Sequence, residues 1–148
     1  MNVAVLGASA NPLRYSHKAV ALLPAAMGGR PDHLLGNVAL VARRPGQVAI
    51  WHDGGTLVAL GPGHEARLDG AIGSVVSLLQ WGDEKPCIYT RGLKYFLHGP
   101  PLRNATHGMS NEMVERPAYV RIKAGVLLLW VSSGGVDTGE NAGNGCGL

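Results

Sequence analysis

The sequence predicts a mainly β protein: an antiparallel, jelly-roll-like β-sandwich preceded by a truncated β-α-α unit. From residue 45 onward, seven short apolar runs alternate with turn-forming Gly, Pro and Asp, a spacing typical of strands in sandwiches and barrels. Hydrophobic residues make up 46% of the chain, aromatic residues only 5%, and there are 22 Gly. This composition indicates a core of Val, Leu, Ile and Ala with many tight turns.

Residues 1–44 are expected to form the short α/β segment. Residues 2–6 (NVAVL) predict a buried strand, which is followed by the Gly-rich turn GASANP and an amphipathic helix over residues 15–23. A second helix is predicted to begin at Pro31, because proline suits the first helical turn and Asp32 lies near the positive end of the helix dipole. The apolar positions of this helix are Leu34, Leu35, Val38 and Val41.

Residues 45–131 are expected to form the sandwich, and residues 132–148 a flexible tail. The tail has much Gly and few apolar residues, so it has little to bury. No helical pattern of any length interrupts the apolar runs of the sandwich. Those runs are residues 47–51, 56–60, 74–80, 87–90, 93–97, 118–123 and 125–131.

Charge, hydropathy and cysteine content exclude several classes of protein. The net charge is +3, but Lys and Arg are scattered, which does not favour nucleic-acid binding. The apolar run at residues 125–131 is far too short to cross a membrane, and the start of the chain lacks the pattern of a signal peptide. Cys87 and Cys146 have no metal-like or CxxC spacing, which predicts reduced cysteines and a cytoplasmic protein.

Two polar segments carry a family resemblance. Residues 28–41 read GGRPDHLLGNVALV, and residues 92–97 read GLKYFL; the latter are followed by GMSNE at residues 108–112 and by two apolar strands. This combination resembles the thiamine pyrophosphokinase family, in which Gly-Gly-Arg-x-Asp-His, Gly-Leu-Lys-Tyr and a Ser-Asn motif occur in the same order. The resemblance covers approximately residues 25–131, and its sandwich part is similar to the family's C-terminal thiamine-binding domain.

The resemblance implies an activity and an assembly. Members of this family transfer a diphosphoryl group from ATP to the hydroxyethyl group of thiamine with Mg²⁺, giving thiamine diphosphate and AMP. Their active site lies between the α/β part of one subunit and the β-sandwich of its partner. We therefore expect thiamine and ATP as ligands, Mg²⁺ as cofactor and a homodimer.

On the nucleotide side, the resemblance implies roles for residues around the second helix. Arg30 is expected to bind an ATP phosphate, because a guanidinium matches phosphate oxygens bidentately. Asp32 is expected to hold Mg²⁺ or position the thiamine hydroxyl, with helix capping or a surface charge as the alternative. His33 and Asn37 lie four residues apart on one helix face, where nucleotide binding and packing are both open.

On the thiamine side, the expected residues lie in the sandwich. Ser110 and Asn111 can hydrogen-bond the edge of the aminopyrimidine ring. Trp130 can provide an aromatic face for the cationic thiazolium ring, and its alternative role is that of a core tryptophan.

The sequence also departs from the family. The acidic motifs Gly-Asp-x-Asp-Ser and Lys-Asp-x-Thr-Asp are absent, and Asp32 is the first acidic residue in the chain. A non-catalytic, dimeric thiamine-binding module is therefore an alternative function. The first 23 residues are instead similar to the start of CoA-binding Rossmann-type proteins, so a CoA or nucleotide binder is a third hypothesis.

Overall fold

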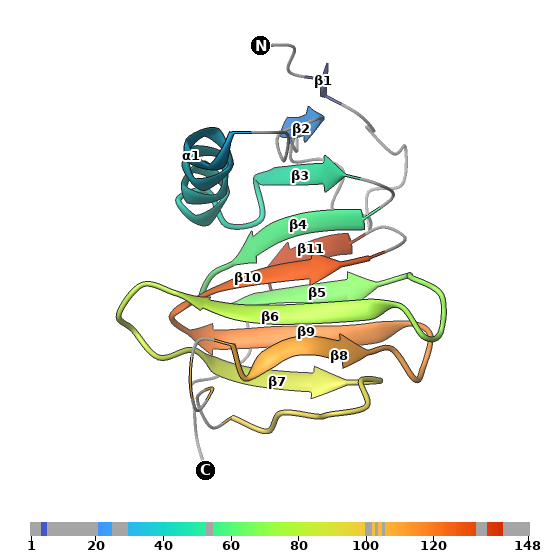
Figure 1. Ribbon diagram of the computed structural model, residues 1–148. Helices are drawn as coiled ribbons and strands as arrows, with labels where there is room; N and C mark the ends of the chain where they lie inside the picture. The colour runs from blue at the N-terminus through green and yellow to red at the C-terminus, as the bar shows by residue number, and fades with distance from the viewer. Residues whose placement is uncertain are drawn as a thin grey trace.

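The computed structural model describes residues 4–5, 21–24, 30–52, 55–99, 102, 104, 106–132 and 136–140. Within these ranges, two β-sheets pack face to face, and one helix lies against the outer face of the larger sheet (Figure 1). The predicted fold class, a mainly β sandwich with a short α/β part, is confirmed.

The larger sheet combines the α/β segment with half of the sandwich. Its strands are antiparallel except for β2 and β3, which run parallel and are joined through the helix α1 (Pro31–Ala42). A parallel pair needs such a crossover connection, so this part is a β-α-β unit. In spatial order the strands are β1 (Ala4–Val5), β2 (Ala21–Pro24), β3 (Val48–His52), β4 (Gly55–Leu60), β10 (Val126–Val131), β6 (Val75–Trp81) and β8 (Gly108–Glu112).

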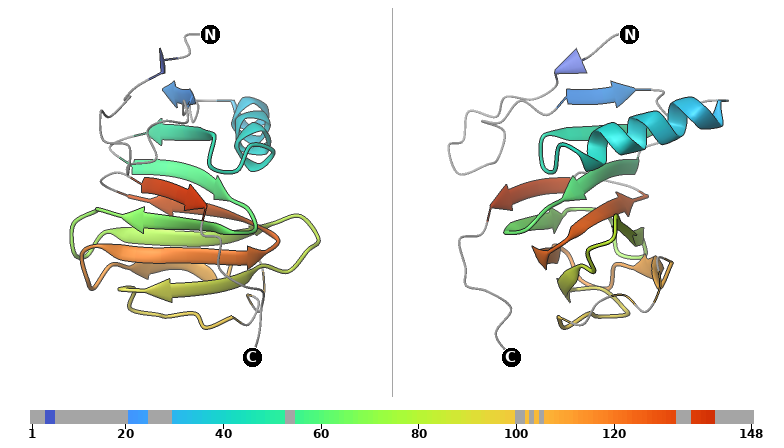
Figure 2. Two further views of the ribbon diagram at one scale, coloured as in Figure 1. Left: turned by 180° about the vertical axis from the view of Figure 1, so that it is seen from behind. Right: turned by 90° about the vertical axis from the view of Figure 1, so that its left-hand side faces the viewer.

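The smaller sheet is antiparallel throughout and covers the other side of the core. Figure 2 shows the two sheets as separate layers, with α1 beside β3 and outside the sandwich. In spatial order its strands are β11 (Val136–Glu140), β5 (His64–Leu68), β9 (Ala118–Ala124) and β7 (Cys87–Arg91).

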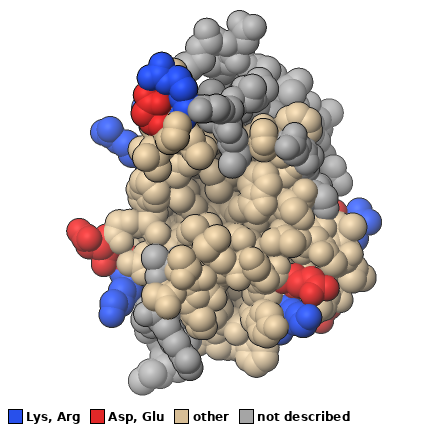
Figure 3. All heavy atoms as spheres, viewed as in Figure 1, with Lys and Arg blue, Asp and Glu red and all other residues tan. Residues whose placement is uncertain are grey.

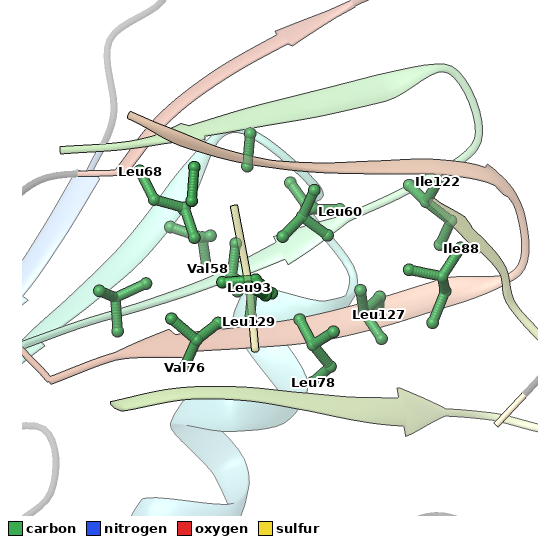
Figure 4. Packing of buried hydrophobic residues seen from close by; sticks show 14 of the residues in the cluster. Val58, Leu60, Leu68, Val76, Leu78, Ile88, Leu93, Ile122, Leu127 and Leu129 are labelled. Atoms are coloured by element: carbon green, nitrogen blue, oxygen red, sulfur yellow. The ribbon is translucent and has the colours of Figure 1, made fainter. Parts of the chain in front are cut away.

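The main core lies between the sheets. It is built from residues that point inward at every second position of each strand, as the side-chain period of a strand requires. Figure 4 shows this packing, with Leu127 and Leu129 of β10 among side chains from both sheets. Other fully buried members are Leu60, Leu68, Val76, Leu78, Ile88, Val120 and Ile122.

A second, smaller cluster lies on the opposite face of the larger sheet, under α1. Val41 and Ala42 at the end of the helix pack there with Ile50 of β3, Leu57 of β4 and Leu128 of β10. All six residues of β4 are buried, because α1 covers one side of the strand and the smaller sheet covers the other.

The predicted second helix is confirmed, and its start follows from local sequence. Pro31 occupies the first turn, where its missing N–H costs nothing, and Arg30 is the N-cap residue with extended backbone. The predicted strand at residues 2–6 is confirmed for Ala4–Val5. The predicted helix at residues 15–23 is wrong where it reaches β2, and its first part lies outside the described residues.

Six of the seven apolar runs contain a strand, and the run at residues 93–97 does not. Gly92 has a positive φ of 77° and ends the strand β7 at Arg91, so the chain turns away from the sheet there. Leu93 is buried in the core, whereas Tyr95 and Phe96 are exposed. The run therefore supplies one core residue and an irregular loop.

Besides β2, three further strands escaped prediction because their sequences are short or polar. β5 (HEARL) turns Ala66 and Leu68 inward and charged side chains outward, and β8 (GMSNE) is an edge strand with a single large apolar residue. β11 pairs with β5 within the segment expected to be a flexible tail, so that expectation is corrected for Val136–Glu140.

Two further expectations concern cysteine and membranes. Cys87 is disulfide-bonded, so the prediction of a reduced side chain is wrong at this position; Cys146 lies outside the described residues. Among the residues that the structure describes, no helix is long and apolar enough to cross a membrane.

Two glycines provide a matched test of this packing. A Cβ on Gly55 would overlap the ring of Trp130 and come 2.8 Å from the carbonyl oxygen of Val131, whereas a Cβ on Gly36 in α1 meets nothing within 4 Å. We expect Gly55→Ala to lower the free energy of unfolding by about 1–3 kcal/mol through overpacking. Gly36→Ala should raise it by roughly 0.5–1 kcal/mol, because alanine loses less entropy in a helix. Urea denaturation measures both, and equal effects of the two substitutions would contradict this packing.

Candidate functional site

The candidate site is built on one row of residues that crosses the larger sheet. The strand registers place Ile50 beside Leu57, Leu57 beside Trp130, and Trp130 beside Ser77. Ile50, Leu57 and Trp130 belong to the cluster on the helix side, so the row lies on that face of the sheet. Figure 3 shows that charged side chains lie mainly at the rim of the face turned toward the viewer in Figure 1.

Trp130 is half-buried on this face. It packs with the cluster under α1, and its six-membered ring occupies the space above Gly55 at the start of β4. Only glycine leaves that space open. The indole is thus both a packing residue of this cluster and a partly accessible aromatic surface.

Ser110 lies next to this row, on the edge strand β8. Its backbone N–H donates a hydrogen bond to the Ser77 hydroxyl oxygen (3.1 Å), so Ser77 lies between Trp130 and Ser110. Ser110 is exposed and has a left-handed φ of 56°, which is uncommon for a residue other than glycine. Such backbone strain is frequent at functional sites.

Asn111 points the other way and is buried, with 4% of its surface exposed. Its side-chain amide donates a hydrogen bond to the Tyr95 carbonyl oxygen (2.6 Å), and its carbonyl oxygen accepts one from the Tyr95 N–H (3.0 Å). The same oxygen also accepts from the N–H of Glu112. The amide therefore pairs with the main chain of Tyr95 as a neighbouring strand would, and it holds the loop that follows β7.

The loop is tied to β8 by further contacts. The Lys94 N–H donates to the carbonyl oxygen of Glu112, and the two side chains form an ion pair of 3.2 Å. The hydrogen bond and charge of Glu112 raise the pKa of Lys94, so this lysine stays protonated. Hydrogen bonds and an ion pair therefore join residues 92–95 to residues 111–114 beside the candidate site.

The other predicted residues lie at the start of α1. Arg30 and Asp32 form an exposed, bidentate ion pair with contacts of 3.2 and 2.6 Å. The hydrogen bond from Arg30 lowers the pKa of Asp32. His33 is exposed and Asn37, one helical turn further on, is half-buried.

Topology brings these residues to one end of the sheet. Because β2 and β3 are parallel and α1 connects them, β2 ends, α1 begins and β3 ends at the same end. β4 starts there too, and β10 and β8 finish there, which brings Trp130 and Ser110 to this end. In open α/β sheets, ligands commonly bind outside the carboxyl ends of parallel strands.

Sequence reasoning missed Ser77 and Gly55. Ser77 is a buried polar residue inside the apolar run SVVSLLQ. A serine that interrupts an apolar run was the signal from which the sequence could have identified it. Gly55 reads as an ordinary turn glycine in the sequence HDGG. Its contact with Trp130 depends on pairing between strands far apart in the chain.

The carboxylates do not form an evident metal site. In the described part of the chain, no group of three or more His, Cys, Asp or Glu side chains is placed to hold a metal ion. Asp32, the predicted Mg²⁺ ligand, is a single carboxylate already engaged by Arg30. Mg²⁺ favours octahedral oxygen ligands with at least one available carboxylate, so the described residues do not fit this ion by themselves.

The described residues thus form a β-sandwich with a β-α-β unit on its larger sheet and a polar, aromatic site at one end of that sheet. No protein-family model and no curated protein matches the sequence. Solved structures do match. Thiamine pyrophosphokinase from Bacillus subtilis is 19% identical, with a TM-score of 0.69 over 78% of this chain and 56% of its own.

Thiamin pyrophosphokinase from Geobacillus thermodenitrificans is 26% identical, with a TM-score of 0.61 over 78% of this chain and 54% of its own. The enzyme from Candida albicans is 14% identical, with a TM-score of 0.59 over 76% and 43%. This chain therefore has the fold of thiamine pyrophosphokinases, which confirms the resemblance seen in the motifs. It spans about half the length of the structures it matches.

The different surroundings of Asn111 and Ser110 can be tested by stability. We expect Asn111→Ala to lower the free energy of unfolding by about 1–3 kcal/mol, because it leaves the main-chain groups of Tyr95 without their partner. Ser110→Ala, at an exposed position, should change it by less than about 0.5 kcal/mol. Chemical denaturation of both variants checks this, and a neutral Asn111→Ala would contradict its role in holding the loop.

Proposed function

We propose that this chain binds thiamine on the helix side of its larger sheet, as the thiamine-binding part of a thiamine pyrophosphokinase-like protein. The observation that carries the proposal is that Ser77 has both residues as neighbours: Trp130 through the strand register and Ser110 through a backbone hydrogen bond. Two residues expected on the thiamine side from sequence thus lie on strands that flank the same residue of β6. The fold shared with thiamine pyrophosphokinases supports the same assignment.

The proposed contacts follow from the chemistry of thiamine. Its thiazolium ring is a flat cation, which a tryptophan face attracts. Its aminopyrimidine edge carries donors and acceptors, which the hydroxyl of exposed Ser110 can satisfy. Asn111 was expected to contact the pyrimidine directly; we now propose that it acts through the loop, because its amide is bonded to Tyr95.

On the phosphate side, we propose that Arg30 releases Asp32 to bind a phosphate of ATP. A guanidinium already held in a bidentate pair can exchange a carboxylate for a phosphate with the same geometry. His33 and Asn37, further along the same helix, are proposed to line the nucleotide. Diphosphoryl transfer to thiamine would require additional groups to hold Mg²⁺, so we assign no step to the metal.

A second candidate function is thiamine binding without catalysis, by a homodimer. The observation that favours it is the isolation of Asp32: no cluster of metal-binding side chains occurs among the described residues. In this case the vitamin site and the dimer would be retained and phosphoryl transfer lost. A cytoplasmic location and the absence of nucleic-acid binding stay predictions for either candidate.

Thiamine binding can be measured by calorimetry with matched tryptophan variants. Trp130→Leu should weaken thiamine binding about tenfold or more, because it removes a cation–π contact, while Trp130→Phe should retain most of it. Trp51→Leu is the control. Trp51 of β3 belongs to the adjacent row of residues, which includes Thr56 and Val131. Val131 is part of the core between the sheets, so this row faces away from the proposed thiamine site. The proposal fails if thiamine does not bind, or if both leucine variants weaken binding equally.

Catalysis is tested separately. The protein is incubated with thiamine, ATP and Mg²⁺, and mass spectrometry is used to detect thiamine diphosphate and AMP. Product formation that falls at least about tenfold in Arg30→Gln supports the transferase, since this substitution removes the proposed charge-assisted contact to the phosphate. Thiamine binding without product, by a chain that light scattering shows to be a dimer, supports the second candidate.

A further inference from the structure

The outer face of the smaller sheet carries an alternating pattern of tyrosine and basic residues. This sheet is nearer the viewer in the left view of Figure 2. The registers place Tyr89 of β7 beside Arg121 of β9, and Tyr119 of β9 between Arg91 of β7 and Arg67 of β5. Each tyrosine therefore has an arginine as its cross-strand neighbour.

These side chains line a groove of about 480 Å³. Tyr89, Arg91, Tyr119 and Arg121 line it from β7 and β9, Glu65 lines it from β5, and His98 lines it from the loop that follows β7. The volume is in the range of sites for small ligands. The closing loop is tied to the sheet by a bridge between Tyr89 and His98 and by a hydrogen bond from the Leu97 N–H to the Thr90 hydroxyl (2.8 Å).

Two positive charges lie over the tyrosine rings. The Arg91 guanidinium lies 4.6 Å from the centre of the Tyr119 ring, and the Lys123 ammonium lies 5.1 Å from the centre of the Tyr89 ring. Arg91 is exposed, so its guanidinium N–H groups are accessible to an anion. The charges are thus oriented before any ligand binds.

Arg121, whose side chain is partly exposed, has one donor atom that lacks a hydrogen bond. Its Nε atom is buried and makes no hydrogen bond, although it lies 3.3 Å from Oε2 of Glu65 in an ion pair. A buried donor without a hydrogen bond is costly. A ligand that draws the Arg121 side chain into the groove would allow this donor to be satisfied.

We propose that this groove is a second binding site, for a small molecule that combines a planar ring with a phosphate group, as a nucleoside monophosphate does. Arg91 and Arg121 supply bidentate donors for the phosphate, and the parts of the tyrosine rings that Arg91 and Lys123 do not cover supply a stacking surface. Glu65 compensates one of the two arginine charges, so the groove keeps an excess positive charge. The site is on the other side of the sandwich from the candidate thiamine site.

The test is a calorimetric titration with AMP, compared with adenosine and with inorganic phosphate. AMP should bind at least about tenfold more tightly than either fragment, because only AMP uses both the rings and the arginines. Arg91→Gln and Tyr89→Ala should each weaken AMP binding about tenfold, whereas Tyr89→Phe should not. Arg44→Gln, at an exposed arginine after α1, is the charge-matched control and should leave the affinity unchanged.

AMP is also a product of the reaction proposed above, so Arg30→Gln separates the two sites. AMP binding that is lost in Arg30→Gln but kept in Arg91→Gln would overturn the groove as its site and leave the proposed function intact. Absence of AMP binding, or equal binding of inorganic phosphate, would also overturn it. So would a decrease in dimer content in Arg91→Gln without any AMP binding, because a second copy of the chain would then occupy this face. Denaturation midpoints confirm that each variant is folded.

Discussion

The burial of β4 and β10 on both faces is the constraint on which the rest of the structure depends. β10 turns Leu127 and Leu129 into the sandwich and Leu128 toward the helix, and β4 is buried along its whole length. Two strands with apolar side chains on both faces of the sheet need other elements packed on both faces, because otherwise large apolar surfaces would be exposed to water. The smaller sheet is one layer and the crossover helix is the other.

The helix covers only part of the larger sheet, and the candidate site lies where that cover is incomplete. α1 packs through its last turn, so its first residues remain exposed at the end of the sheet. Trp130 is packed on its inner side by the cluster under the helix and is still partly accessible. A residue that completes the packing and also offers a surface is well suited to bind a flat ring, because its position is rigid before the ligand arrives.

The connection between the loop after β7 and the edge strand β8 replaces a regular strand pair. Asn111 makes with Tyr95 the hydrogen bonds that a neighbouring main chain would make, and Gly92, Lys94 and Glu112 extend this contact. An amide side chain can do this because it carries both a donor and an acceptor in one plane. The two residues of the Ser-Asn motif therefore have different roles. Asn111 is buried and holds the loop after β7, and Ser110 is exposed.

The sequence by itself determined the class of fold, the helix from Pro31 and most strands, because proline position, apolar runs and turn residues act over short distances. It also named Trp130 and Ser110 as candidate site residues, through a resemblance to a family whose fold the chain shares. Only the tertiary structure decided that both residues have Ser77 as a neighbour, that Gly55 makes room for the indole, and that Asn111 turns inward. The pairing of Tyr and Arg on the smaller sheet was hidden for the same reason. Strand register depends on contacts between segments far apart in the chain, and a shift of one residue would turn every side chain to the other face.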